Sequence, residues 1–383
     1  MRRYKVLLVS CMAWFIFLCF LHYFSARPLW LDEISVFKNI ETFKPAQLLG
    51  PLERSQAFPR VYLIIVKIFS RMFNYSILSL RFFSLISMLG AFFIWKKLYK
   101  DSLSNQWQFL LVLFSFASSY AFSYYAAELK PYSLDVLVVG IFCLYFIHQR
   151  RLANSQPSKL FILATLLLPF TLLLSYGSFF VFWIVVYNFL FRVRRNRKIL
   201  PLILGYITIS LVVMFFAYRF DLKHGLDIRG LFIYWDDYFI STKSPYYFFK
   251  SLGEGLRKLT VWWFGNSNFF RRTASIFIPF FIISLFGYGI RSIRKDKFRL
   301  MSIDAIGMVI FLELVVLGLL KKYPFTGERI TLFFAPFVFY FIVKAISSFR
   351  KIKPLYLGFS VFYIVFLLIC GINTFLAHLK FYG

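Results

Sequence analysis

Long apolar stretches separated by short charged clusters dominate the pattern along this chain. Most of these stretches reach the roughly 17 to 25 residues that cross about 30 Å of hydrocarbon as an α-helix. They are continuously apolar, whereas the strands of a membrane β-barrel alternate, so we expect an all-α polytopic membrane protein. The eleven predicted spans are 6–24, 78–95, 106–124, 132–148, 160–175, 177–191, 199–217, 273–290, 301–320, 330–346 and 355–376. Around Ser175 to Ser178 the pattern predicts a tight turn, with one long kinked helix as the alternative.

Basic residues test this list, because short loops rich in Lys and Arg stay cytoplasmic. Such clusters precede the first predicted span and follow every even-numbered one. Their members are Arg2, Arg3, Lys5, Lys96, Lys97, Lys100, Arg150, Arg151, Lys159, Arg192, Arg194, Arg195, Arg197, Lys198, Arg291, Arg294, Lys295, Lys297, Arg299, Arg350, Lys351 and Lys353. We therefore expect a cytoplasmic N-terminus and an outer C-terminus. The whole chain, 1–383, is predicted to form a single transmembrane domain whose longest outer loops are 25–77 and 218–272.

The segment from Pro59 to Phe73 is apolar but only about fifteen residues long, which is short for a span. Counting it as one would reverse the side of every later basic loop. Arg60, Lys67 and Arg71 fall near one face of a helix there, so we expect an amphipathic helix in the outer membrane interface. Residues 34–49 are predicted to form a similar piece.

Composition agrees with the bilayer as solvent: 60% of the 383 residues are apolar, 22% are aromatic, and the mean hydropathy is +0.71. The net charge of +29 is spread between the apolar stretches instead of forming one basic domain, so no nucleic-acid partner is expected. The four cysteines show no CxxC spacing and the four histidines are scattered, so neither predicts a disulfide framework or a histidine metal site.

The first candidate chemistry is an acidic pair, Asp32 and Glu33, that follows Trp30 a few residues beyond the first predicted span. A carboxylate at this depth can act on a membrane-embedded substrate from the water side, as a general base or as a metal ligand. The structural alternative is an exposed pair of residues that cap the next helix.

A second cluster opens the fourth predicted span. Glu128, Tyr132 and Asp135 have i, i+4, i+7 spacing, although Pro131 favours a helix that begins only there. Asp135 already lies a turn deep, where an ionisable residue is costly and is usually functional or paired. Lys130 is its expected partner, and a purely structural ion pair between the two is the alternative.

A third cluster, residues 321–329, places Lys321, Lys322 and Arg329 on an outer loop against the positive-inside trend. Cations there suggest an anionic ligand such as phosphate. Glu313, near the middle of the ninth predicted span, is a further outlier whose structural interpretation is a hydrogen bond to a neighbouring helix.

Together these residues resemble the GT-C membrane glycosyltransferases, in particular the family 39-like group of protein O-mannosyltransferases and lipid A aminoarabinose transferases. Residues 30–33 match the Asp-Glu pair of the first outer loop. Residues 57–63 and Arg81 are similar to a juxtamembrane Pro-Pro-Leu-Tyr-Tyr helix followed by an arginine, and residues 128–132 are similar to a Glu-x-Arg-x-Tyr segment. Asp135, and the later residues Tyr323, Pro324, Arg329 and Pro336, also follow the pattern.

The resemblance is good over about residues 6–148 and topological beyond, and it has departures. Lys130 replaces an arginine, which loses bidentate phosphate geometry, and Arg60 replaces the second proline. No large soluble domain follows the last span, which favours a bacterial plasma membrane, with the site on the periplasmic side of the cell envelope. The resemblance does not carry over the donor sugar or the acceptor.

The resemblance implies a transferase that takes a sugar from a polyprenyl-phosphate carrier and gives it to the hydroxyl of a lipid, glycan or protein acceptor. Asp32 is expected as the general base of an inverting reaction, and Glu33 as the residue that orients it or shares a divalent cation, if one is used. Donor-phosphate contacts are expected from Lys130, Arg329 and Arg81. Glu128, Tyr132 and Asp135 are expected as supporting residues, with Asp135 holding Lys130.

Two other functions fit a polytopic basic chain. A transporter or lipid flippase would favour charged or broken helices at mid-membrane and an internal repeat, of which only Glu313 is evident. A polysaccharide polymerase or ligase would use a diphosphate-linked donor.

Overall fold

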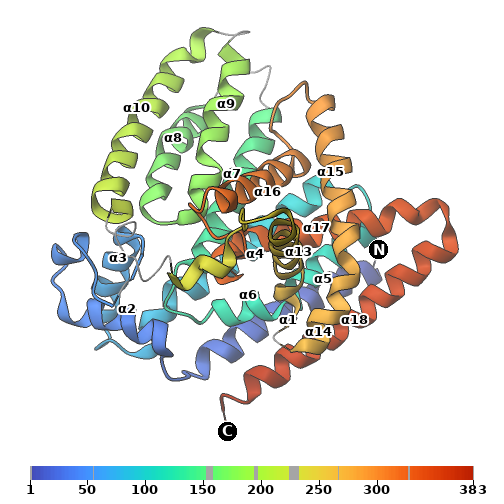
Figure 1. Cartoon of the computed structure of the whole chain (residues 1–383), viewed down its shortest axis with the longest axis horizontal. Coiled ribbons are helices and arrows are strands. Elements are labelled where there is room, and N and C mark those ends of the chain that lie inside the picture. Colours follow the sequence, from blue (N-terminus) through green and yellow to red (C-terminus); the bar gives the residue numbers. More distant parts are fainter. Residues whose placement is uncertain are drawn as a thin grey trace.

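The computed structural model describes residues 2–54, 56–151, 158–193, 197–223, 233–265, 267–326 and 328–382, and over these residues it is helical with no strand. Eight helical stretches are long and apolar enough to cross a membrane. They contain α1 (Arg2–Phe24), α4 (Ile77–Ser102), α7 (Tyr132–Arg151), α9 (Phe182–Val193), α10 (Leu200–Ala217), α15 (Ile278–Lys295), α17 (Ala335–Ser348) and α18 (Lys353–Leu379). The chain is therefore an all-α polytopic membrane protein (Figure 1).

The three remaining predicted spans coincide with shorter apolar helices, namely α5 (Gln106–Ala117), α8 (Lys159–Leu167) and α16 (Ile303–Leu319). The predicted span 106–124 is broken, because α5 ends at Ala117 and a separate short helix, α6 (Tyr120–Tyr125), follows. Ser119 lies at this break. Its hydroxyl donates to the carbonyl oxygen of Trp263, a residue remote in sequence, at 2.8 Å.

Further helices connect the long ones. The α-helices are α2 (Leu31–Thr42), α3 (Arg60–Arg71), α13 (Pro245–Val261) and α14 (Asn268–Ala274). The 3₁₀ turns are η1 (Gln47–Leu49), η2 (Leu168–Leu173), η3 (Tyr176–Phe180), η4 (Arg197–Ile199), η6 (Asp236–Tyr238), η7 (Trp262–Phe264), η8 (Ser275–Phe277), η9 (Glu328–Phe334) and η10 (Phe349–Lys351), and a π-helical turn, η5, covers Tyr218–Leu222. The long loop predicted at 218–272 thus contains α13 and α14. Its residues His224 and Asp227, like the basic residues Arg194 and Arg195, lie outside the described part of the chain.

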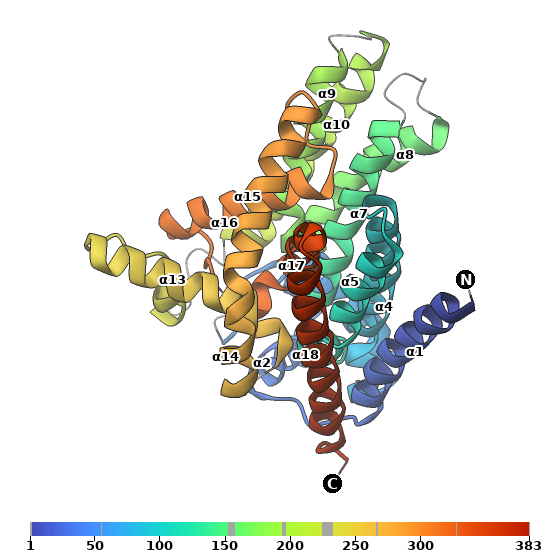
Figure 2. The ribbon, with the colours of Figure 1, turned by 90° about the vertical axis from the view of Figure 1, so that its right-hand side faces the viewer.

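The ends of the helices separate the basic clusters from the acidic loops. In Figure 2 the end of α7, the facing ends of α9 and α10 and the facing ends of α15 and α16 lie toward the top. The C-terminus of the chain and α2 lie toward the bottom. These basic helix ends therefore lie at one end of the helix bundle, and α2 lies toward the other.

The centre of the bundle is closely packed. The largest helix contact joins α4 and α7, and Gly140 of α7 makes it possible. A Cβ atom at Gly140 would lie 2.9 Å from the Trp95 ring nitrogen, and that indole is fully buried and donates to the Val136 carbonyl oxygen at 3.1 Å. Helix α17 is the most buried spanning stretch. This packing fixes α4 and α7, the helices that present Arg81 and the 128–130 segment.

A smaller hydrophobic cluster holds α2 and α3 against the start of α4. It contains Val36, Ile40, Leu48, Phe58, Tyr62, Leu63, Val66, Leu80 and Leu129. The prediction of a helix at 59–73 is confirmed by α3. An amphipathic helix at the interface is expected to turn its polar face outward, and α3 does not. Arg60 and Lys67 are buried and point inward, whereas Ile68 and Met72 are exposed. Lys67 donates to the backbone carbonyl oxygen of Ile40, which draws the cation inside.

Candidate functional site

The chain reverses direction immediately after α1. Ser25 donates to the His22 carbonyl oxygen at 2.7 Å, and Ala26 adopts a left-handed conformation with φ of 44°. The following residues are extended until α2 begins at Leu31. Glu33 lies in the first turn of α2 and accepts from the Trp30 backbone N–H at 3.4 Å, so it caps the helix. The structural alternative predicts an exposed pair, but Glu33 is fully buried.

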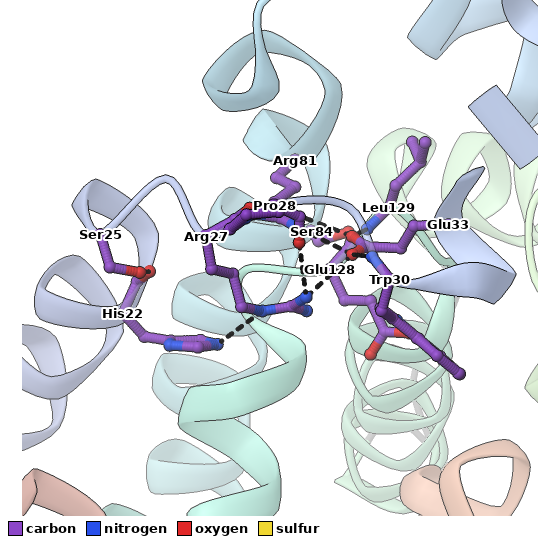
Figure 3. Close-up of polar contacts among 10 residues, drawn as sticks. All are labelled: His22, Ser25, Arg27, Pro28, Trp30, Glu33, Arg81, Ser84, Glu128 and Leu129. Atoms are coloured by element: carbon purple, nitrogen blue, oxygen red, sulfur yellow. Dashed lines mark hydrogen bonds and ion pairs between the residues drawn. The ribbon is translucent and has the colours of Figure 1, made fainter. Parts of the chain in front are cut away.

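Glu33 is the centre of a fully buried ionic network (Figure 3). One of its carboxylate oxygens lies 2.7 Å from an Arg81 guanidinium nitrogen and 3.0 Å from an Arg27 nitrogen. The other accepts from Arg81 Nε at 2.9 Å and from the Leu129 backbone N–H at 2.7 Å. Two cations and two backbone donors therefore saturate this carboxylate, and they tie α2 to α4 and to the segment before α7.

Asp32, the neighbouring carboxylate, lies in a different environment. Its Oδ1 is 3.0 Å from Lys130 Nζ, and its Oδ2 is 3.2 Å from an Arg329 nitrogen. The Asp32 side chain remains 18% exposed, whereas Glu33 has no exposed surface. The structure therefore brings together three residues that the sequence analysis assigned to one site, and it leaves Asp32 as the accessible member of the acidic pair.

The aromatic ring of Trp30 lies within the same cluster. Its indole nitrogen donates to Glu128 Oε1 at 3.1 Å, and the Arg329 guanidinium carbon lies 4.9 Å from the ring centroid. Lys130 also donates to Gln56 Oε1 at 2.9 Å. Both cations that contact Asp32 are thus held by second partners, which fixes where their charge lies.

The cluster carries an excess of positive charge. Its acids are Asp32, Glu33 and Glu128, and its bases are Arg27, Arg81, Lys130 and Arg329, four cations against three carboxyl groups. Burial and the neighbouring Glu33 raise the pKa of Glu128 to about 7, although the nearby cations oppose this. Near neutral pH part of the Glu128 population is therefore uncharged, which increases the excess of positive charge in the cluster. Such a cluster favours an anionic ligand.

Burial also lowers the pKa of Lys130 from its ordinary value, and the Asp32 carboxylate acts against this shift. One oxygen of Glu128 and the Nε of Arg329 are buried without a hydrogen-bond partner. Buried groups of this kind are usually paired, so the site has unused hydrogen-bonding capacity beside its accessible carboxylate.

Two predicted roles do not fit these contacts. Arg81 has no exposed surface, and its guanidinium is bound to Glu33 and to the Arg27 carbonyl oxygen at 2.8 Å, so its donors are directed to the protein. Asp135 does not hold Lys130: it accepts from Ser175 Oγ at 2.6 Å and from the Gly177 backbone N–H at 3.0 Å. The reason is that α7 begins at Tyr132, so the side chain of Asp135 turns toward the 175–177 turn and away from Lys130.

The other predicted site residues also have defined places. Tyr132 is buried and its ring meets that of Tyr125 edge to face, with centroids 5.4 Å apart, so it supports the segment from inside. Glu313 accepts from the Trp183 indole nitrogen, which confirms its structural interpretation as a hydrogen bond to a neighbouring helix. Lys321 pairs with the exposed Asp236 at 2.9 Å and is not part of the cluster.

Sequence reasoning missed Arg27 and Gln56, which complete the cluster, and the role of Trp30 as a hydrogen-bond donor. The only sign of Arg27 in the sequence is its place as a basic residue just after the first predicted span. Arg60 forms a second buried pair, in which its Nε lies 3.9 Å from Asp221 and 3.0 Å from the Phe220 carbonyl oxygen. Nothing in the local pattern links α3 to the end of α10, so this pair could not be predicted.

The donor set does not fit a divalent cation. Among the described residues no group of three or more His, Cys, Asp or Glu side chains is arranged so that it could hold a metal ion. Glu33, the expected partner of Asp32 in metal ligation, has both oxygens bound by arginines, and Asp32 itself faces two cations. We therefore assign no step to a metal.

Comparison of the chain with protein-family models, with curated protein sequences and with solved structures gives no match. The class that the fold defines is thus that of a polytopic α-helical membrane protein with a buried, net cationic cluster around an accessible aspartate.

Proposed function

We propose that the chain is a membrane glycosyltransferase that moves a sugar from a polyprenyl-phosphate carrier to an acceptor hydroxyl, with inversion at the anomeric carbon. The observation that carries the proposal is the accessible carboxylate of Asp32 between Lys130 and Arg329. Such a reaction needs a base for the acceptor proton and cations for the departing phosphate within a few ångströms of one another. The motif resemblance to GT-C enzymes points to the same three residues.

In this reaction Asp32 removes the proton from the acceptor hydroxyl while the acceptor oxygen attacks the anomeric carbon. The bond from that carbon to the phosphate oxygen breaks, and its electron pair leaves with the prenyl phosphate. Lys130 and Arg329 stabilise the charge on this leaving group. Electrostatic stabilisation of this kind is most effective in a water-poor site, and both cations are largely buried, with 6% and 18% of their side chains exposed.

The same contacts suggest how donor binding prepares the base. The two cations lie on the oxygens of Asp32. A bound phosphate would compete with the carboxylate for these cations, and their shift toward the phosphate would free Asp32 for the acceptor hydroxyl. Donor binding and activation of the base would then be a single event.

Glu33, Arg27 and Arg81 are positioning residues in this proposal. Their network fixes the start of α2, which carries Asp32, against Leu129, next to Lys130. Because Glu33 is saturated by its partners, it takes no part in proton transfer.

The proposed arrangement in the membrane has eleven spans and a cytoplasmic N-terminus, with the site at the outer, periplasmic face of a bacterial plasma membrane. Its support is the positive-inside pattern, together with the separation of the basic helix ends from α2 seen in Figure 2. The proposed donor would then lie with its prenyl chain among the helices and its phosphosugar at Asp32.

The test is transfer in liposomes that contain the purified full chain, radiolabelled polyprenyl-phosphate sugars and candidate lipid, glycan or peptide acceptors. A new glycosidic product that is lost in Asp32→Asn supports the proposal. A product formed only from diphosphate-linked donors would identify a polymerase or ligase instead. Movement of the labelled lipid across the bilayer without any product would identify a transporter or flippase.

Glu41→Gln serves as the matched control for Asp32→Asn. Glu41 is on the same helix, and its pair with Lys38 is about half exposed. Transfer by this variant should equal that of the unmodified chain. Full activity of Asp32→Asn would remove Asp32 from the mechanism.

A further inference from the structure

An apolar groove lies between α1, α5, α17 and α18, away from the Asp32 cluster. It has a volume of about 800 Å³. Its lining residues include Leu7, Ser10, Trp107, Ile346, Ser360 and Ile372. In Figure 2, α1 and α18 run in the same downward direction, with α5 between them. We therefore expect the groove to open toward lipid, because α1 and α18 also border the membrane.

The groove begins at one end of the helix bundle. Its first lining residues fall within the first two turns of α1, α5 and α18, and Ile346 and Ser347 are in the last turn of α17. This is the end at which α1 starts, opposite the segment that carries Asp32. Along α18 the lining extends from Tyr356 to Ile372, about 24 Å at 1.5 Å per residue. One leaflet contributes about half of the roughly 30 Å hydrocarbon core, so the groove is long enough for an acyl chain.

Exposed cations lie where the groove meets the start of α18. Lys353 precedes Leu357 by one turn on α18, and residues one turn apart share a helix face, so Lys353 lies beside the groove. Arg350, in η10, lies between the lining residues Ile346 and Ser347 of α17 and the start of α18, and its side chain is also exposed. Asp101, the carboxylate of the α4 end, pairs with Lys97 at 3.0 Å.

The groove ends in the second half of α18, near Gly371 and Ile372. A Cβ atom at Gly371 would lie 3.4 Å from both Ser118 Oγ and the Trp14 ring nitrogen, so the helices come into contact there. A long apolar groove with cations beside one end matches one chain of a phospholipid whose headgroup stays at the membrane surface.

We propose that this groove is a binding site for an anionic diacyl phospholipid, with one acyl chain between α1, α5 and α18 and the phosphate at Arg350 and Lys353. Charge complementarity selects an anionic over a zwitterionic headgroup, because each cation near a membrane surface favours an anionic lipid by about fivefold. This site is separate from the proposed donor site, and its existence does not depend on the glycosyltransferase proposal.

The test is native mass spectrometry of the full chain in micelles that contain equal amounts of dioleoylphosphatidylglycerol and dioleoylphosphatidylcholine. We expect the unmodified chain to retain phosphatidylglycerol preferentially, by at least about fivefold. Lys353→Glu should remove this preference. Lys295→Glu, an exposed cation at the end of α15, is the matched control and should leave it unchanged.

Filling the groove separates chain binding from a general surface attraction. Ser360→Trp on α18 and Ser10→Trp on the opposite wall should each abolish retention of both lipids, whereas Val361→Trp, which faces outward from α18, should not. Retention unchanged in both filling variants would overturn the proposal. Equal retention of the two lipids by the unmodified chain would also overturn it, as would displacement of phosphatidylglycerol by polyprenyl phosphate.

Discussion

Asp32 and Glu33 are adjacent in sequence, yet their carboxylates differ in burial and in their partners. Glu33 is completely buried between two arginines, whereas Asp32 is 18% exposed between Lys130 and Arg329. Because α2 begins at Leu31, the two side chains point to different sides of its first turn. A rotation of about 100° between successive helix positions thus separates a structural carboxylate from one that can meet a substrate.

Glu33→Gln should strongly destabilise the chain. The substitution leaves Arg27 and Arg81 buried without a counter-charge, and breaking a buried ion pair costs about 3 to 5 kcal/mol. The measurement is thermal unfolding of the purified protein in detergent. Asp32→Asn removes a charge from a partly exposed position and keeps an acceptor for Lys130 and Arg329, so it should lower the melting temperature less than Glu33→Gln. Equal losses in the two variants would contradict the distinct roles.

Asp32→Asn should lower transfer by at least about 10²-fold, the contribution of a positioned general base. The measurement is the single-turnover rate with saturating donor, so that a change in donor binding does not enter. Donor binding itself should not weaken, because the amide no longer competes for Lys130 and Arg329. A variant that loses donor binding but keeps its single-turnover rate would assign Asp32 to binding.

Lys130→Ala and Arg329→Ala should each weaken binding of a polyprenyl-phosphate sugar by about 10-fold or more, since a charge-assisted hydrogen bond contributes about 1.5 to 3 kcal/mol. Arg329→Lys should recover only part of the loss, because it keeps the charge but not the guanidinium fork or its contact with Trp30. Equilibrium binding of labelled donor to the detergent-solubilised protein measures this. Lys321→Ala, whose pair with Asp236 is exposed, is the control and should bind normally.

Donor affinity should fall as the pH rises through about 7. The pKa of Glu128 is raised to about 7, so above this pH the group gains a negative charge beside the anionic donor, and below it the group is neutral. The phosphodiester of a prenyl-phosphate sugar keeps one charge over this range, so the ligand does not contribute. Binding at pH 6 and pH 8 should differ in the unmodified chain and much less in Glu128→Gln, which retains an acceptor for the Trp30 indole.

Gly140→Ala should destabilise the bundle by about 1 to 3 kcal/mol. Its Cβ would meet the Trp95 ring nitrogen at 2.9 Å, and this indole is buried and hydrogen-bonded, so it has no room to move. Gly358→Ala, with open space around its Cβ position on α18, should instead stabilise its helix by about 0.5 to 1 kcal/mol. The melting temperatures of the two variants, measured in detergent, should shift in opposite directions. A lower melting temperature for Gly358→Ala would contradict this prediction.

The apolar pattern predicts the helices well because hydrocarbon accepts few other structures. It misses the break between α5 and α6, because the partner that Ser119 binds, the Trp263 carbonyl oxygen, is remote in sequence. The candidate site follows the same rule. Spacing identified Asp32, Lys130 and Arg329 near one surface, but it could not show that Arg81 is saturated by Glu33 or that Asp135 turns to Ser175. Position along a helix is local information, whereas the choice of partner is set by tertiary packing.

Helix α3 buries Arg60 and Lys67 but exposes Arg71, and it places Ile68 and Met72 outside, with 56% and 75% of their surfaces exposed. Exposed apolar surface of this kind is unfavourable in water and favourable against hydrocarbon. We therefore expect the first loop to border lipid, and a water-soluble fragment that contains only this loop to aggregate. In the proposed topology this segment would hold Asp32 beside the bilayer and away from bulk water.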